Sequence, residues 1–127
     1  MERIFVFGNP DLPIDSLPVR LLPALHEALP DVSFEMLDPN EEWDMPEHPF
    51  IIDTIVNLPE PQIVRGLSAF VAAPRMTCHD FDAYANLLFL KKLGKITDVT
   101  VFGVPPRYNE AQLVTWLERE LRNELCM

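Results

Sequence analysis

RIFVFGNPDLPIDSLPVRLLPALHEAL, residues 3–29, joins a strand to a helix. The apolar run at residues 3–7 is short and continuous, which is typical of a strand buried on both faces of a sheet. Leucines then recur at helical spacing over residues 16–29, so this segment is predicted to be an amphipathic helix. Pro18 is compatible with a first helical turn, whereas Pro23 lies deeper and is expected to kink or shorten the helix.

The same alternation of strands and helices continues along the chain. Further strands are predicted at residues 32–37, 50–56, 67–72 and 99–104, and further helices at residues 80–94 and 109–125. Such a pattern is typical of a mainly parallel sheet covered on both sides. We therefore expect residues 1–127 to form a single α/β domain, a three-layer α/β/α sandwich with a central sheet of about five strands. Ligands of these sheets bind beyond the carboxyl ends of the strands.

Composition and charge exclude several functions. The formal net charge of -10 argues against binding nucleic acid or an anionic membrane through a basic surface, because such contacts need clustered Lys and Arg. No apolar stretch approaches the roughly 18 residues of a membrane span, and no signal peptide is recognisable, so we expect a cytoplasmic protein. Cys78 and Cys126 are too few for a disulfide framework and lack the spacing of a structural zinc site. No serine-hydrolase, dinucleotide or phosphate-loop motif is present.

Three side chains are candidates for chemistry at the carboxyl edge of the predicted sheet: Asp15, Asp53 and His79. An acid inside the run IIDTIV must be paired, hydrogen-bonded or metal-bound if it is buried, because desolvating a carboxylate costs several kcal/mol. Two carboxylates and an imidazole form a mixed oxygen and nitrogen site suited to nickel, zinc or manganese. His26 and His48 are interpreted as surface residues, with His48 as the reserve ligand.

Each of these three residues also has a plain structural interpretation. Asp15 could cap the helix that follows it, since Asp is favoured at that position. Asp53 could lie in solvent or cap a turn if its strand ends early. His79 lies within a capping-box pattern formed by Thr77 and Asp80, which would explain the local polarity without any chemistry.

Five segments, read in order, carry a resemblance to a known family. They are IFVFGNPDLPIDSLPVR, EMLD, FIIDTIV, MTCHDF and VTVFGVPP. Together they resemble the nickel-iron hydrogenase maturation endopeptidase family across nearly the whole chain. Gly8-Asn9 and Val19-Arg20 match the family's first loop and helix, and VFGVPP at residues 101–106 looks like its last strand and following turn.

The resemblance implies a set of site residues. Members of the family adopt the α/β/α fold and recognise the nickel of their substrate through two acids and a histidine, which are matched here by Asp15, Asp53 and His79. The family's acid after the second strand is matched by Asp38, which is expected to orient the water or the peptide, or simply to end the strand in a turn. Ile14 replaces the first member of the family's acidic pair.

By this resemblance the chain is expected to be a metal-dependent endopeptidase that removes the C-terminal extension of a nickel-iron hydrogenase large-subunit precursor after nickel insertion. Its expected partner is that precursor, which carries the nickel ion. Zinc or another divalent metal is expected to act as a surrogate for nickel, and the chain is expected to be a monomer. Two alternatives stay open: a non-catalytic maturation chaperone or metal-binding protein of the same fold, and a small-ligand α/β domain without a metal.

Overall fold

The computed structural model describes the backbone of residues 2–37, 41, 43–56, 58–72 and 78–126, and it leaves the side chains of residues 70–72 and 78–83 undescribed. The elements are β1 Glu2–Val6, the short 3-10 helix η1 Pro13–Asp15, α1 Leu17–Arg20, α2 Leu22–Ala28, β2 Val32–Met36, β3 Phe50–Thr54, β4 Gln62–Arg65, α3 Leu67–Ala72, α4 Cys78–Lys92, β5 Thr100–Val104 and α5 Glu110–Glu124. Within these ranges no helix is long and apolar enough to cross a membrane.

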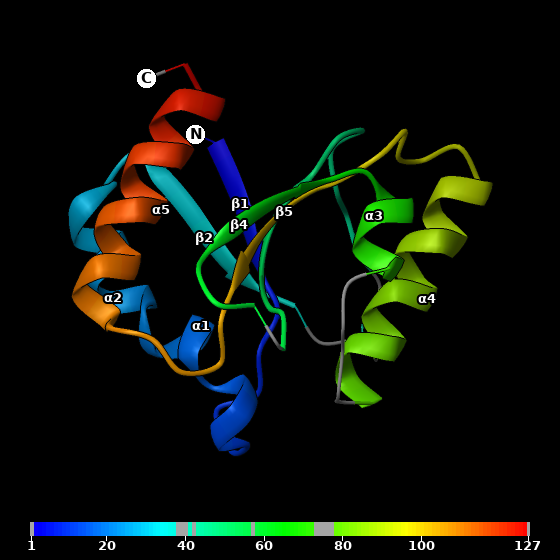
Figure 1. The fold of residues 1–127 in the computed structure, drawn as a ribbon. Helices are drawn as coiled ribbons and strands as arrows, with labels where there is room; N and C mark the ends of the chain where they lie inside the picture. The colour runs from blue at the N-terminus through cyan, green and yellow to red at the C-terminus, as the bar shows by residue number, and fades with distance from the viewer. Residues whose placement is uncertain (1, 38–40, 42, 57, 73–77, 127) are drawn as a thin grey trace.

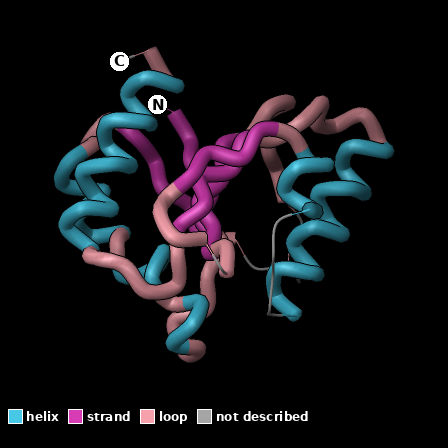
Figure 2. The backbone as a smooth tube through the Cα atoms, in the orientation of Figure 1, coloured by secondary structure: helices cyan, strands magenta, loops and turns pink. Residues whose placement is uncertain are grey.

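The strands form one sheet in the order β2-β1-β3-β5-β4. The strands β1, β2, β3 and β5 run parallel, and β4 joins the edge antiparallel to β5. Helices α1, α2 and α5 cover one face of the sheet, while α3 and α4 cover the other (Figure 1). The strands therefore form a middle layer between two helical layers (Figure 2), which confirms the predicted three-layer α/β/α fold with a mainly parallel sheet.

The apolar run at the start of the chain feeds both layers of the core. Successive side chains of a strand point to opposite faces. Accordingly, Ile4 and Val6 pack with the helices α1, α2 and α5, whereas Phe5 and Phe7 pack with residues of the α3 and α4 layer. All four side chains are fully buried, which explains why the run is continuously apolar rather than alternating.

The predicted helix at residues 16–29 is present, and it is divided as Pro23 indicated. Leu21 ends α1 and precedes α2, and a proline occupies the first turn of each of the two helices. A proline is tolerated there because the amide it lacks has no intrahelical partner at a helix start. At the end of α4, Gly94 adopts a φ of 75° and its amide donates to the carbonyl of Lys91, so a glycine closes the helix predicted at residues 80–94.

One predicted strand is wrong: residues 67–72 form helix α3, and the edge of the sheet is instead β4, Gln62–Arg65. Gly66, with a φ of 97°, turns the chain between the two elements. The amide of Leu67 at the start of α3 then donates to Asp98 Oδ1 at 2.6 Å. Because this acceptor lies 31 residues away, the short apolar run contained no local signal that distinguishes a helix from a buried strand.

Candidate functional site at the carboxyl edge of the sheet

Asp15 is held in a tight loop after β1. The chain continues the sheet as far as Phe7, whose amide donates to the carbonyl of Ile52 at 2.9 Å. The loop then folds back, and the amide of Asn9 donates to the carbonyl of Asp15, also at 2.9 Å. Asp15 ends η1 and is only 1% exposed. Ser16, not Asp15, occupies the N-cap position of α1, so the capping interpretation of Asp15 is wrong.

Gly8 allows the Asp15 loop to pack closely on the end of β1. A Cβ atom at this position would lie 3.0 Å from Val19 Cγ2 and 3.1 Å from the carbonyl oxygen of Asp15. Both distances are shorter than an ordinary van der Waals contact of a Cβ atom. The glycine in the Gly8-Asn9 pair is therefore needed because the backbone carrying Asp15 passes so near it.

Asp53 lies inside the central strand β3 and is fully buried. The interpretation in which the strand ends before it is therefore wrong. Ile51 belongs to the core beneath α3 and α4, and Ile52 to the opposite core. Because successive side chains of a strand point to opposite faces, Asp53 lies on the same face as Ile51, toward α3 and α4. Its Oδ1 accepts a hydrogen bond from the amide of Thr54 at 2.9 Å.

Gly103 of β5 lies directly across from Asp53 in the parallel register. A Cβ atom at Gly103 would come within 2.5 Å of Ile55 Cδ1, so the close packing of this part of the sheet depends on a glycine. Gly103 was not among the residues predicted to shape the site. A lone glycine inside the strand predicted at residues 99–104 is the signal that would have indicated such a close approach.

His79 lies in the first turn of α4, and its side chain falls outside the description. The other end of α4 lies near the start of β5, because Lys91 Nζ is 4.0 Å from Asp98 Oδ1, two residues before Thr100. A helix of 15 residues is about 22 Å long, so α4 begins at the opposite, carboxyl edge. In Figure 1 the start of α4 and helix α1 both lie at the lower end of the view.

Asp38 lies outside the described residues. The strand before it, β2, ends at Met36 on the same edge, where the amide of Leu37 donates to the carbonyl of Val6 at 3.0 Å. His48 is exposed, as expected, but its Nε2 lies 2.9 Å from Thr100 Oγ1 at the amino-terminal edge. It is therefore far along the sheet from the carboxyl edge that carries Asp53.

Two buried acids lie at the carboxyl edge of the sheet, Asp53 inside β3 and Asp15 in the loop after the neighbouring strand β1. Among the side chains that the structure describes, no three of His, Cys, Asp and Glu lie together so as to hold a metal ion. The predicted trio includes His79, whose side chain is not among them. The roles of Asp15, Asp53, His79 and Asp38 therefore stay predictions, and their chemistry, carboxylate and imidazole, suits a divalent transition metal.

These features define the class of protein as a three-layer α/β/α domain with two buried acids where the parallel strands have their carboxyl-terminal ends. Among solved structures, the hydrogenase maturating endopeptidase HybD from E. coli has this fold, with a TM-score of 0.69 and 22% sequence identity, over 98% of this chain and 92% of that chain. No family model matches the sequence. No curated protein matches it either. At the level of the fold, the structure confirms the resemblance to the hydrogenase maturation endopeptidases.

Proposed function

We propose that the chain is a cytoplasmic, monomeric endopeptidase that removes the C-terminal extension of a nickel-iron hydrogenase large-subunit precursor after nickel has been inserted. The observation that carries this proposal is the burial of Asp15 and Asp53 at the carboxyl edge of a sheet whose fold is that of HybD. Ligands of parallel α/β sheets bind at this edge. The five sequence segments that resemble the maturation endopeptidases give further support.

The precursor brings its own nickel ion to the site. Asp15, Asp53 and the neutral imidazole of His79 contact that ion, and zinc or another divalent metal acts as a surrogate because it accepts the same ligands. The metal polarises the scissile carbonyl or lowers the pKa of a water molecule, so hydrolysis needs no covalent nucleophile from the enzyme. Asp38 orients the attacking water or the peptide. Precursor without nickel lacks this activation and is left uncut.

The test compares two isosteric changes in neighbouring residues of β3. In Asp53→Asn the side chain keeps its shape and the oxygen that accepts the Thr54 amide, but it loses the negative charge. Thr54→Val is the matched control, because Thr54 is equally enclosed at 2% exposure and faces the other side of the sheet. Each variant is incubated with nickel-loaded and with nickel-free precursor, and the mass of the large subunit is followed over time.

Wild type and Thr54→Val are expected to shorten only the nickel-loaded precursor. Asp53→Asn is expected to do so at least about tenfold more slowly, as is typical when a group that organises a metal centre is changed. Circular dichroism of both variants checks that the fold is retained. Cleavage of nickel-loaded precursor by Asp53→Asn at the wild-type rate would remove Asp53 from the mechanism.

The presence of Ile14 favours a second candidate function. This half-buried apolar residue of η1 stands where the maturation endopeptidases have the first acid of a pair, so the loop carries one carboxylate fewer. In the second candidate the chain is a non-catalytic chaperone of the same fold, which binds the precursor or its metal. Binding of nickel-loaded precursor without any loss of mass, by wild type and by an Ile14→Asp variant, is the result expected of this chaperone.

A further inference from the structure

A hollow of about 320 Å³ lies between helices α3 and α4. The two helices stand next to each other over one face of the sheet (Figure 1). We call it the lysine hollow, and its lining residues are Leu67, Ser68, Tyr84, Leu88, Lys91 and Lys92. The lysines belong to the last turn of α4, which lies beside Asp98, two residues before the start of β5. The lysine hollow is therefore on the amino-terminal side of the sheet, away from the carboxyl edge.

The wall of the lysine hollow is fixed by the core, and its rim is polar. Its four residues from α4 follow one another after four, three and one positions, so they share one face of that helix. Tyr84 and Leu88 are half-buried and pack against the core beneath α3 and α4, and Leu67 is only 3% exposed. Ser68 and the two lysines are exposed. A ligand thus meets an apolar surface of defined shape and, beside it, polar groups that are open to solvent.

The charged residues that line the lysine hollow are both cationic, although the chain as a whole has a net charge of -10. Lys91 Nζ lies 4.0 Å from Asp98 Oδ1, but that oxygen already accepts the amides of Leu67 at 2.6 Å and of Val99 at 3.0 Å. Lys92 forms no ion pair with any residue that the structure describes. Two ammonium groups therefore outnumber the one carboxylate beside them, and an anion in the hollow is attracted.

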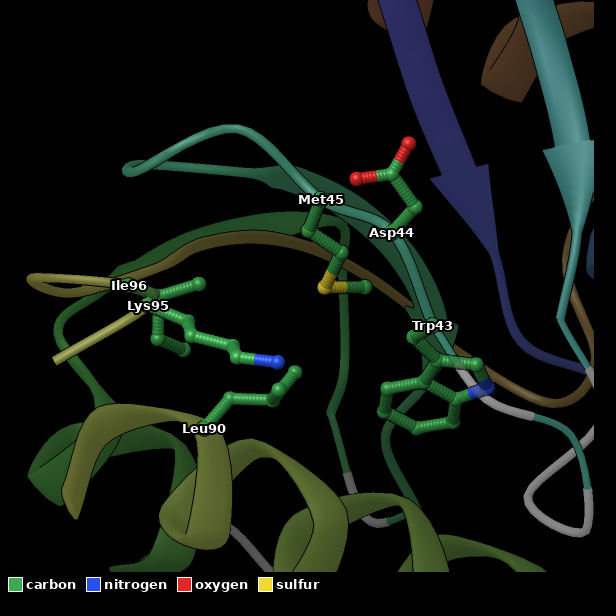
Figure 3. Close-up of a pocket in the computed structure, with 6 residues that line it drawn as sticks. All are labelled: Trp43, Asp44, Met45, Leu90, Lys95 and Ile96. Atoms are coloured by element: carbon green, nitrogen blue, oxygen red, sulfur yellow. The ribbon is translucent and has the colours of Figure 1, made fainter. Parts of the chain in front are cut away.

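The third lysine of the sequence has different surroundings. Lys95 lines a separate hollow of about 530 Å³, and Asp44 lines that hollow too (Figure 3). An anion near Lys95 is therefore repelled by a carboxylate in the same hollow. The six residues that line the lysine hollow include no acid. Positive charge without a competing acid is thus a property of the lysine hollow and not of every lysine at this end of α4.

The donor groups of the lysine hollow suit a phosphate group better than a carboxylate. Lysine binds phosphate as a point charge, whereas the planar fork of arginine is the usual partner of a carboxylate, and no arginine is among the lining residues. The Ser68 hydroxyl can donate a further hydrogen bond, and a phosphate group offers several strong acceptor oxygens. The volume reaches the lower end of the range of about 300–1,000 Å³ that is typical of small-molecule sites, so there is room for an organic group on the apolar wall.

We propose that the lysine hollow binds a small phosphate monoester. The ammonium groups of Lys91 and Lys92 and the hydroxyl group of Ser68 contact the phosphate, and the apolar wall contacts the organic part of the ligand. Nickel, the precursor and the carboxyl edge play no part in this binding, so it is independent of the proposed peptidase activity.

The experiment titrates the full chain with phenyl phosphate in a phosphate-free buffer and measures the dissociation constant by isothermal titration calorimetry. Benzoate keeps the ring but carries a carboxylate, phenyltrimethylammonium keeps the ring but is a cation, and inorganic phosphate lacks the ring. Phenyl phosphate is expected to bind with a dissociation constant of about 1 mM or less. Each of the other three compounds is expected to bind at least about fivefold more weakly, and added salt is expected to weaken the binding of phenyl phosphate.

Variants of exposed residues then locate the site with little disturbance of the fold. The pair Lys91→Gln, Lys92→Gln is expected to weaken the binding of phenyl phosphate about tenfold or more, and Ser68→Ala about twofold to tenfold. Lys95→Gln is the matched control, because it removes the same charge from the same end of α4 but from a different hollow. It is expected to bind within about twofold of wild type. Thermal unfolding checks that all variants are folded.

Three results would overturn the proposal. Phenyl phosphate bound no more tightly than benzoate would show that the lysine hollow does not select a phosphate group. Inorganic phosphate bound as tightly as phenyl phosphate would remove the role of the apolar wall, and with it the monoester. Unchanged affinity in the variant that lacks both Lys91 and Lys92, or an equal loss in Lys95→Gln, would place the binding elsewhere on the surface.

Discussion

Gly103→Ala is expected to destabilise the protein by about 1–2 kcal/mol, although it adds a single methyl group. The added Cβ would lie 2.5 Å from Ile55 Cδ1 and 3.2 Å from Leu58 Cδ1. Non-bonded carbon atoms rest about 3.5–4.0 Å apart, so the contact with Ile55 is about 1 Å too short. Ile55 is fully buried, and therefore it cannot swing into solvent to relieve the clash.

The magnitude follows from the two ways in which the site can respond. Pushing Ile55 off its rotamer costs about 0.5–1.5 kcal/mol, and overpacking a core costs about 1–3 kcal/mol in all. Alanine also gains about 0.5–1 kcal/mol over glycine inside a strand, because glycine loses more backbone freedom on folding. The middle of the overpacking range, about 2 kcal/mol, less the middle of the alanine gain, about 0.75 kcal/mol, leaves a net loss of a little over about 1 kcal/mol in the free energy of unfolding.

A double-mutant cycle tests the cause as well as the size of the effect. Ile55→Val removes the Cδ1 atom that clashes, and by itself it is expected to cost about 0.5–1.5 kcal/mol. In the Gly103→Ala background that cost is expected to fall by about 1 kcal/mol, because the shorter side chain makes room for the new methyl group. Urea unfolding, followed by the fluorescence of Trp43 and Trp116, measures all four proteins. Additive effects, or a Gly103→Ala protein as stable as wild type, would refute the packing argument.

Three further changes probe other parts of the structure by the same urea unfolding. The hydrogen bond from Arg3 is the main cause that lowers the pKa of Glu35 in the folded protein. The pair therefore stabilises the fold at pH values above the ordinary pKa of Glu, and this contribution is lost as the pH falls through the lowered pKa. Both side chains are more than a third exposed, so Glu35→Gln is expected to cost less than about 1 kcal/mol near neutral pH. That cost is expected to shrink as the pH falls below the ordinary Glu pKa, and a cost that stays constant with pH would contradict the reasoning. Leu117→Ala, in the fully buried face of α5, is expected to cost about 2–5 kcal/mol, whereas the exposed Arg119→Ala changes stability by less than about 0.5 kcal/mol. Gly8→Ala is expected to cost about 1 kcal/mol, because the new methyl group would contact the Asp15 carbonyl, which a hydrogen bond from the Asn9 amide holds in place. A variant as stable as wild type would show that the loop moves to accommodate the methyl group.

The local pattern of the sequence determined the elements whose signals repeat within a few residues. The continuous apolar run before Gly8 predicted a strand buried on both faces, and β1 is such a strand. Pro23 predicted the break between α1 and α2. Its effect can be read locally, because the hydrogen bond that proline cannot donate would have been formed within the same helix. For Asp53, the isoleucine-rich run left a buried acid and a solvent-exposed turn both open, and the structure buries it.

Only the tertiary structure decided features that depend on contacts between distant residues. The segment at 67–72 is a helix whose first amide donates to Asp98, and no pattern within the segment indicates that contact. Likewise, parallel pairing in register placed Gly103 across from Asp53, and the course of α4 brought its first turn to the edge where Asp15 lies. Hydrophobic periodicity reports which side of an element is buried, whereas the choice of neighbour is made when the whole chain packs.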